Sequence, residues 1–517
     1  MTRRLLQVAA VALLALVVMR PAAAQDLLAD FEQKVTTFTL DNGLTFVVVE
    51  RPEAPVVSMH TYADVGSVDE VKGITGIAHL FEHMAFKGTD TVGTLDIEAE
   101  RAAIAAENAA FDALRKEQQK GALADAERIT ELTATLEAAT EATKPFVEPN
   151  EFDQIVTRAG GTGLNASTSV DATRYFYSLP ANKLELWFSL ESDRFLNPVL
   201  REFFAEREVV KEERRMVTDS NPVGRLVEEF LSTAFKAHPY GEPIIGHMSD
   251  IATMTRAEAL DFYRTYYVPS NLTVALVGAV DPDNAKRLAE TYFGRLPAAP
   301  KPEAVETVEP AQIGERRVII REQTQPFVLV GYHKGSMFSE DAAVFDMLAS
   351  ILGTGRTSRI YKSLVEEQQL ALQAGAFNSF PGNKYPSLMA FFVVPNQGQA
   401  PEDVEAAIYA EIDRIKTEGV TEEELTRAKT IARANLVRQL GSNTGLASMM
   451  AMHQALYGDW REVFYSLDRL DAVTAADVQR VANETFRPNN RTVAMIVTET
   501  EETASVQSEQ DAAGDTR

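Results

Sequence analysis

Short apolar runs that are rich in β-branched residues recur along the first half of the chain, as is typical of β-strands. Phe46–Val49 and Val57–Ala63 are the first two such runs. Leu164–Val170 and Thr173–Leu179 form a second pair, and Asn271–Val280 is largely apolar, which predicts a buried strand. Segments with helical periodicity separate these runs, so we expect an α+β fold.

A spacing of three or four positions between apolar residues predicts the intervening helices. They are expected at Ile77–Lys87, Glu151–Ala159, Leu184–Phe195, Glu202–Met216 and Thr255–Tyr267. The last begins with Thr255, a residue type that caps helix N-termini. The glycine-rich stretch 160–163 is expected to break the chain between a helix and the strand that follows it.

The segment Leu95–Thr143 has a different composition, because it is rich in Ala and Glu. Its apolar residues, among them Phe111 and Leu132, recur with helical spacing, and Lys120-Gly121 is a plausible turn. We therefore expect a helical hairpin inserted at about residues 97–148. Two roles remain open for it: a solvated surface appendage, or an arm that docks on a partner.

The two halves of the chain resemble each other. Pro269–Val277 matches Pro488–Ile496 at an offset of 219 residues, whereas Gly66-Ser67 matches Gly335-Ser336 at an offset of 269. The offsets differ by 50 residues, which is close to the length of the predicted hairpin. The pattern predicts a duplicated unit whose first copy carries one insertion.

The ends of the chain and one internal stretch suggest the domain boundaries. Arg3 and Arg4 precede an apolar run that ends at Ala22-Ala23-Ala24, which predicts a secretory signal peptide over residues 1–24. Pro and Ala dominate the stretch around residues 297–312, which predicts a linker between domains at 25–296 and 313–498. Residues 499–517 are polar and acidic, which predicts a disordered tail.

Composition narrows the possible chemistry. The 517 residues include no cysteine, which excludes disulfides, thiolate metal ligands and a cysteine nucleophile. A net charge of −25 argues against nucleic acid as a partner. Outside the signal sequence there is no long apolar run, so we expect an exported, periplasmic protein with no membrane span in the mature chain.

The predicted helix Ile77–Lys87 carries the candidate chemistry. It contains His79, Glu82 and His83 in the order H-x-x-E-H. On a helix the two histidines share a face and Glu82 lies beside them, as in a class of zinc peptidases. The offset of 269 places Leu348, Ile351 and Leu352 at the same positions of the second copy, so only the first copy is expected to hold a metal.

A catalytic zinc site needs a third protein ligand. The other histidines, His60, His238, His247, His333 and His453, are scattered along the sequence, and we interpret them as hydrogen-bonded structural residues. A carboxylate on a following helix is the natural source of the third ligand. Glu206 and Glu213 lie seven positions apart and share a face of the predicted helix Glu202–Met216, whereas Glu208 and Glu212 fit ordinary surface charges.

Five segments together resemble the pitrilysin/insulinase family of zinc peptidases, and most of all its bacterial and mitochondrial processing-peptidase branch. They are HLFEHMAFKGT, GGTGLNASTS, EREVVKEE, HPYGEPIIG and PSNLTVALVG, in this order. The resemblance implies two homologous α/β-sandwich halves, each a mixed sheet with packed helices, that close as a clamshell around a chamber. It also implies one Zn²⁺ per chain and the hydrolysis of peptides or unfolded polypeptide.

The resemblance assigns roles to individual residues. It implies that His79, His83 and Glu213 bind the zinc, that Glu206 orients a ligand, and that Glu82 is the general base on the metal-bound water. It further implies that the edge strand beginning at Asn165-Ala166 pairs with the substrate backbone. The gap from His83 to Glu213 is longer than usual in the family by about the length of the hairpin.

The sequence departs from the family at one place. Many relatives carry an Arg and a Tyr that hold the substrate from the second half, and Val365 and Leu372 occupy those positions here. This departure suggests a heterodimer in which a homologous chain without metal supplies the Arg/Tyr pair. Two alternatives to a peptidase remain: a catalytically inactive binding or assembly protein, and a purely structural zinc site.

Overall fold

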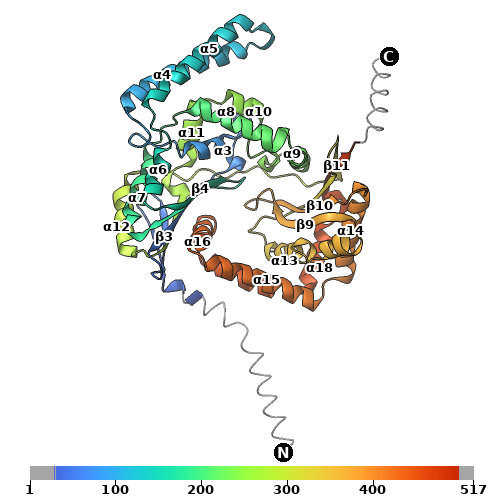
Figure 1. Cartoon of the computed structure of the whole chain (residues 1–517). Helices are drawn as coiled ribbons and strands as arrows, with labels where there is room; N and C mark the ends of the chain where they lie inside the picture. The colour runs from blue at the N-terminus through green and yellow to red at the C-terminus, as the bar shows by residue number, and fades with distance from the viewer. Residues whose placement is uncertain (1–27, 30, 500–517) are drawn as a thin grey trace, which may run out of the picture.

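Two β-sheets face each other as the halves of a clamshell in the computed structural model, which describes residues 28–29 and 31–499 (Figure 1). Both sheets are mixed and both carry packed helices, which confirms the predicted fold. The predicted signal peptide at residues 1–24 lies outside the described residues, as does the predicted tail apart from Glu499.

The first sheet has six strands in the order β1-β2-β6-β3-β5-β4. They are β1 (Val35–Thr39), β2 (Thr45–Glu50), β3 (Val56–Ala63), β4 (Thr162–Thr168), β5 (Thr173–Pro180) and β6 (Leu272–Gly278). The edge strand β1 was not predicted, because its VTTFT sequence is short and its side chains remain partly exposed. β4 begins at Thr162 rather than at Leu164, since part of the glycine-rich stretch forms a bulge in the strand.

Apart from the hairpin, eight α-helices of the first half have both ends among the described residues. They are α3 (Ile77–Met84), α6 (Glu151–Arg158), α7 (Leu184–Leu196), α8 (Phe203–Arg214), α9 (Pro222–Ala234), α10 (Met248–Thr253), α11 (Arg256–Tyr266) and α12 (Pro282–Tyr292). Thr255 caps α11 by accepting a hydrogen bond from the Glu258 amide, as predicted. The motif helix α3 is shorter than predicted, because the chain turns after Met84 and reaches a left-handed Gly88.

The second sheet has five strands in the order β7-β11-β8-β10-β9. They are β7 (Arg316–Glu322), β8 (Phe327–Lys334), β9 (Ala371–Phe380), β10 (Ser387–Pro395) and β11 (Arg491–Thr498). The helices of the second half are α13 (Ala342–Gly353), α14 (Pro401–Glu418), α15 (Glu422–Leu440), α16 (Asn443–Tyr457), α17 (Glu462–Ala472) and α18 (Ala475–Thr485).

The strand register confirms the internal duplication. The order β2-β6-β3-β5-β4 of the first sheet equals β7-β11-β8-β10-β9 of the second, with one parallel pair at the same place in each. Tyr62 pairs with Thr273 in the first sheet, and Gly331 pairs with Thr492 in the second. These pairs reproduce both predicted offsets, 269 and 219 residues, in a single register.

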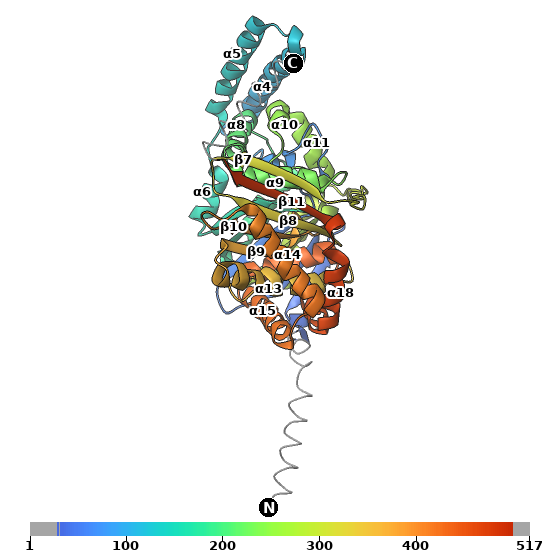
Figure 2. The ribbon, with the colours of Figure 1, turned by 90° about the vertical axis from the view of Figure 1, so that its right-hand side faces the viewer.

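The two halves exchange one helix each. α16, from the second half, packs on the first sheet, where Leu446 and Met450 join the cluster around Val47 and Val277. α9, from the first half, packs on the second sheet, which Figure 2 shows as β7, β11 and β8 lying over it. Because each sheet is covered on one face by a helix of the other half, the two halves share their apolar cores.

A Phe230→Ala substitution tests this exchange. Phe230 of α9 is fully buried against the second sheet, and Gly331 leaves the space that its ring fills, since a Cβ at Gly331 would come within 2.6 Å of it. We expect the substitution to lower the free energy of unfolding by about 3–5 kcal/mol. Chemical denaturation measures the change, with exposed Glu229→Ala as the matched control on the same helix. Equal stability of the two variants would contradict the shared core.

The hairpin consists of α4 (Ile97–Gln118) and α5 (Ala126–Thr143), joined by a short turn at Gly121–Leu123, as the sequence predicts. It projects from the first half in both views (Figures 1 and 2). The hairpin is more than a solvated appendage, because α4 buries Glu100, Glu107 and Phe111 against the body of the protein. Docking of its outer part on a partner stays a prediction.

Residues 297–313 form neither helix nor strand, and the domain boundaries drawn around them stay predictions. Among the helices of the described residues, none combines the length and the apolar character that a membrane crossing requires.

Candidate metal centre

The N-terminus of α3 is fixed by buried polar groups. Gly76 adopts a left-handed conformation with φ of 88°, and a Cβ there would meet the Ile245 carbonyl oxygen at 2.4 Å. The Glu70 carboxylate accepts hydrogen bonds from the backbone amides of Gly76 and Ala78, each at 2.8 Å. An acidic group at this end satisfies amides that have no partner within the helix, and it matches the helix dipole.

One face of α3 is packed into the core, which aims its other face at the candidate site. Ile77, Leu80, Phe81 and Met84 are all buried. The Phe81 ring lies 5.1 Å from Tyr263 and 4.5 Å from Tyr267 between ring centroids, so α11 fixes the rotation of the helix. His79, Glu82 and His83 consequently lie on the opposite, partly exposed face.

α8 brings the two predicted carboxylates to that face. The helix packs directly against α3, and its own apolar side is anchored by buried Phe203 and Val210. Beyond Arg214 the helix widens into a short π-helical turn, Arg215–Asp219. Glu206 and Glu213 lie two turns apart on α8 and face His83, whereas Glu208 and Glu212 point outward and pair with Lys211 and Arg215.

His79, His83 and Glu213 converge on one point. Glu213 Oε2 lies 3.8 Å from His79 Nε2 and 3.6 Å from His83 Nε2, and the three potential ligand atoms all lie within 4.8 Å of one another. No other group of three potential ligands is this close in the described part of the chain. The structure therefore brings together the residues that the sequence analysis proposed as ligands.

This donor set fits zinc. Two imidazole nitrogens and one carboxylate oxygen are typical zinc ligands, and tetrahedral zinc at its usual bond lengths separates its ligands by about 3.3 Å. The observed distances of 3.6 and 3.8 Å need only a small closure to reach this value. The three side chains are partly exposed, which leaves an open side where a substrate group and a water could approach the metal.

The two histidines differ in their electrostatics. Burial, together with the neighbouring His83, lowers the pKa of His79 to about 4, so its ring is neutral at neutral pH and can donate a lone pair to a metal. His79 Nδ1 is buried without a hydrogen-bond partner among the described residues. Burial alone would lower the pKa of His83 as well, but the hydrogen bond and charge of Glu206 raise it.

Glu206 holds His83 from behind. Its Oε1 lies 2.8 Å from His83 Nδ1, and its Oε2 lies 2.7 Å from Lys87 Nζ. Burial opposes the charge of Glu206, but the hydrogen bonds from His83 and Lys87 lower the pKa of its carboxyl to about 2. An ionised Glu206 accepts a hydrogen bond from His83 Nδ1. This leaves His83 Nε2 free to face the site, as in metal-bound histidines that have a carboxylate behind them.

Glu82 is placed as a base next to these ligands. Burial raises the pKa of its carboxyl, and the negative charge of Glu213 acts in the same direction. The carboxyl lies near Thr168, at the end of β4. A carboxylate with a raised pKa takes and returns a proton near neutral pH more readily than an exposed one does.

β4 is the edge strand of the first sheet and packs beside α3. Asn165 and Ala166 pair with Phe176 and Tyr175 of β5, and no described strand pairs with the other edge of β4. Asn165 is exposed, whereas Ala166 is buried against the sheet. An extended peptide could therefore be added to this edge, next to the converging ligands.

Two models of a known protein family match the sequence of this chain. A model of the insulinase family (peptidase family M16) matches residues 45–118 and 121–247, which include the motif helix and α8. A model described as the peptidase M16 inactive domain matches residues 253–432. The chain belongs to the insulinase family of peptidases. Leu348, Ile351 and Leu352, which occupy the positions of the metal helix in the second half, are buried in its apolar core.

Related proteins span nearly the whole chain. The zinc protease PqqE of Helicobacter pylori is 29% identical over 473 residues, which cover 90% of this chain and 93% of that protein. A solved protease from Helicobacter pylori superimposes with a TM-score of 0.75 at 28% identity, over 90% of this chain and 99% of that one. The first half of the periplasmic protease PqqL from Escherichia coli has a TM-score of 0.65 at 20% identity, over 92% and 94%, which shows a shared fold.

The remaining histidines of this insulinase-family chain are structural, with one correction to the prediction. His238, His247, His333 and His453 make hydrogen bonds, as expected. His60 makes none, because both ring nitrogens are buried without a partner among the described residues. It stacks instead on Phe176, and burial lowers its pKa to about 3.

Sequence reasoning missed Lys87 and Glu70. Lys87 lies just beyond α3 and contacts both Glu202 and Glu206. Glu202 and Glu206 lie four positions apart, and the repulsion between them indicates a nearby cation, but the sequence does not show which cation that is. Glu70 gave no such signal, because its two amide partners are defined only by the loop that leads into α3.

Proposed function

We propose that this protein is an exported zinc metalloendopeptidase that hydrolyses peptides or unfolded polypeptide segments. The observation that carries the proposal is the convergence of His79, His83 and Glu213, with Glu82 beside them and an open strand edge next to them. A chain that had become a binding or assembly protein would have no reason to keep a complete ligand set. The second half differs in this respect, because the positions equivalent to His79, Glu82 and His83 hold buried apolar residues.

Zinc bound by His79, His83 and Glu213 would supply a Lewis acid that activates water and polarises the scissile carbonyl. Glu82 takes the proton of the attacking water and delivers it to the leaving amine, so that the same carboxyl acts first as base and then as acid. Glu206 keeps His83 in the orientation and tautomer that present Nε2 to the site. The edge of β4 holds the substrate backbone in an extended conformation.

The free edge of β4 suggests the substrate class. Strand addition uses backbone hydrogen bonds, so it accepts many sequences but requires an extended chain. A folded protein cannot offer an extended segment to a strand edge inside a clamshell.

Removal of the metal with 1,10-phenanthroline should abolish the cleavage of an unfolded polypeptide, and added zinc should restore it. Cleavage that persists at full rate without metal would contradict the proposal.

The chain is also proposed to act with a homologous partner. Val365 lies partly buried against the second core and Leu372 is 58% exposed, and neither side chain can hold a carbonyl or carboxylate of the substrate. Many relatives carry an Arg and a Tyr at these positions, and we propose that a second chain supplies them here.

A reconstitution experiment tests the partner. We expect the purified chain alone to cut a peptide library slowly, and the product of a neighbouring homologous gene to raise the rate by about 100-fold, as the loss or gain of substrate-positioning groups does. The control is a partner whose Arg and Tyr are replaced by Val and Leu. Full activity of the chain alone, unchanged by the partner, would refute the heterodimer.

The proposed location is the periplasm. It rests on the signal-like sequence of residues 1–24 and on the likeness in fold to a protein named as a periplasmic protease in Escherichia coli. Cell fractionation, together with N-terminal sequencing of the mature chain, tests it. A cytoplasmic protein that retains Met1 would contradict it.

A further inference from the structure

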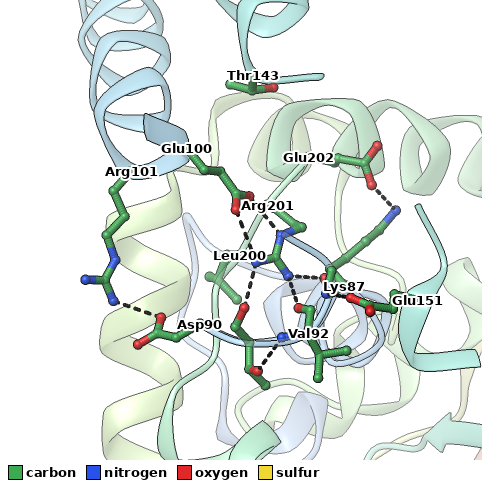
Figure 3. A network of polar contacts seen from close by, with 12 residues as sticks. Lys87, Asp90, Val92, Glu100, Arg101, Thr143, Glu151, Leu200, Arg201 and Glu202 are labelled. Atoms are coloured by element: carbon green, nitrogen blue, oxygen red, sulfur yellow. Dashed lines mark hydrogen bonds and ion pairs between the residues drawn. The ribbon is translucent and has the colours of Figure 1, made fainter. Parts of the chain in front are cut away.

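A continuous series of polar contacts runs from the inserted hairpin to the metal centre. Figure 3 shows its first part, from Glu100 through Arg201 to Lys87. It begins at Glu100 on α4, whose side chain is completely buried. Glu100 accepts hydrogen bonds from Arg201 Nε at 2.8 Å and from Arg201 Nη2 at 3.3 Å. Arg201 lies in the connection between α7 and α8, directly before the helix that carries Glu206 and Glu213.

Arg201 in turn holds the loop that follows α3. Its guanidinium donates to the carbonyl oxygens of Lys87, Thr89 and Val92. The figure shows this group surrounded by the loop, with the carboxylate of Glu100 on its other side (Figure 3). A guanidinium fixed on both sides has one position, and so does the Lys87 backbone that it binds.

From the Lys87 backbone the series continues along its side chain. Lys87 Nζ lies 3.1 Å from Glu202 Oε2 and 2.7 Å from Glu206 Oε2. The other oxygen of Glu206 contacts His83 Nδ1 at 2.8 Å. Glu100, Arg201, Lys87 and Glu206 thus connect the hairpin to a metal-ligand candidate in four steps.

Charge explains why a cation is needed at this place. The carboxylates of Glu206 and Glu213 contact His83, and the carboxylate of Glu202 lies next to that of Glu206 at Lys87. Without Lys87, His83 would be the one remaining side-chain partner of the Glu206 carboxylate among the described residues, and nothing would fix which carboxylate oxygen faces it. Bonded to Lys87 through one oxygen, Glu206 can only offer the other oxygen to His83.

Resting on the proposed zinc site, we propose that Lys87 is a positioning residue for His83, and that helix α4 of the insertion braces it through Glu100 and Arg201. The hairpin is then part of the metal-binding architecture. Zinc affinity, and not only stability, depends on its buried base.

Two Lys87 variants test the first step. Lys87→Met removes the charge and keeps the aliphatic stem, whereas Lys87→Arg keeps a cation. We expect Lys87→Met to weaken zinc binding by about 10-fold, within the range known for groups behind metal ligands, and Lys87→Arg to restore most of it. Competition with a chromogenic chelator measures the affinity, and the absorption bands of the cobalt-substituted chain report the ligand geometry. Lys72→Met, which removes an exposed lysine, is the control.

A matched pair of buried carboxylates tests the second step. Glu100 pairs with Arg201, and Glu107, on the same face of α4, pairs with Arg256 at 2.6 Å. Both carboxylates are completely buried, but Arg256 does not contact the loop that contains Lys87. We expect Glu100→Gln and Glu107→Gln to lower the melting temperature alike, by several degrees, because each leaves a buried arginine uncompensated. Only Glu100→Gln should also weaken zinc binding.

The outcomes separate this inference from the proposed function. A wild-type chain that binds no zinc would overturn both. Tight zinc binding in the wild type together with equal affinity in Lys87→Met would overturn the inference and leave the proposed function standing. Equal loss of zinc affinity in Glu100→Gln and Glu107→Gln would also overturn the brace, since it would show a general effect of destabilisation.

Discussion

Replacing Glu82 by Gln is expected to lower the rate of peptide hydrolysis by about 10²–10⁴-fold while zinc remains bound. The amide keeps the shape of the side chain but cannot take a proton from water. The carboxyl is not among the three groups that converge on the metal position, so zinc content should stay at the wild-type level. Measured turnover and elemental analysis of the same sample check both parts of the expectation.

Glu208→Gln is a suitable control for this experiment. Glu208 lies on α8 two positions from Glu206, but it is more than half exposed and pairs with Lys211. Its replacement should change neither turnover nor zinc content. Wild-type turnover in the Glu82→Gln chain would refute the assignment of the general base.

Replacing Glu213 by Gln is expected to remove most of the bound zinc, because it takes away the only carboxylate oxygen within reach of both His79 Nε2 and His83 Nε2 in the described part of the chain. The loss of affinity should exceed the 10–100-fold that changes behind the ligands cause. Wild-type chain should also be stabilised by zinc, by about 2.7 kcal/mol when free zinc is 100 times the dissociation constant. The Glu213→Gln chain should lose this stabilisation.

Glu212→Gln provides the comparison for that variant. Glu212 is the preceding residue on α8, is 72% exposed and pairs with Arg215. Thermal unfolding with and without zinc should give the wild-type shift for Glu212→Gln and almost none for Glu213→Gln. Equal shifts in the two variants would show that the third ligand is another residue.

The sequence predicted the features that depend on spacing. His79 and His83 share a face because four positions make about one helical turn, and Glu206 and Glu213 share a face because seven make about two. The two offsets of the repeat followed from short sequence matches, and the pairing of Tyr62 with Thr273 and of Gly331 with Thr492 confirms both. Periodic patterns survive folding because packing acts on whole faces of an element.

Features that depend on contacts between distant segments could not be predicted. The exchange of α9 and α16 between the halves leaves no local signal, since an apolar helix face looks the same whichever sheet it covers. The partner of Lys87 is chosen by the fold of the loop around Arg201, and the stacking of His60 on Phe176 depends on pairing between β3 and β5. The role of the hairpin could not be predicted either, because in the sequence Glu100 is indistinguishable from the other acidic residues of its helix.

The proposed function requires one zinc ion bound between the motif helix α3 and helix α8. Anomalous diffraction from a crystal of the purified chain, recorded at the zinc absorption edge, tests it most directly. We expect a single strong peak at bonding distance from His79 Nε2, His83 Nε2 and a carboxylate oxygen of Glu213. The absence of a peak there in zinc-saturated crystals, or a peak bound by other residues, would contradict it.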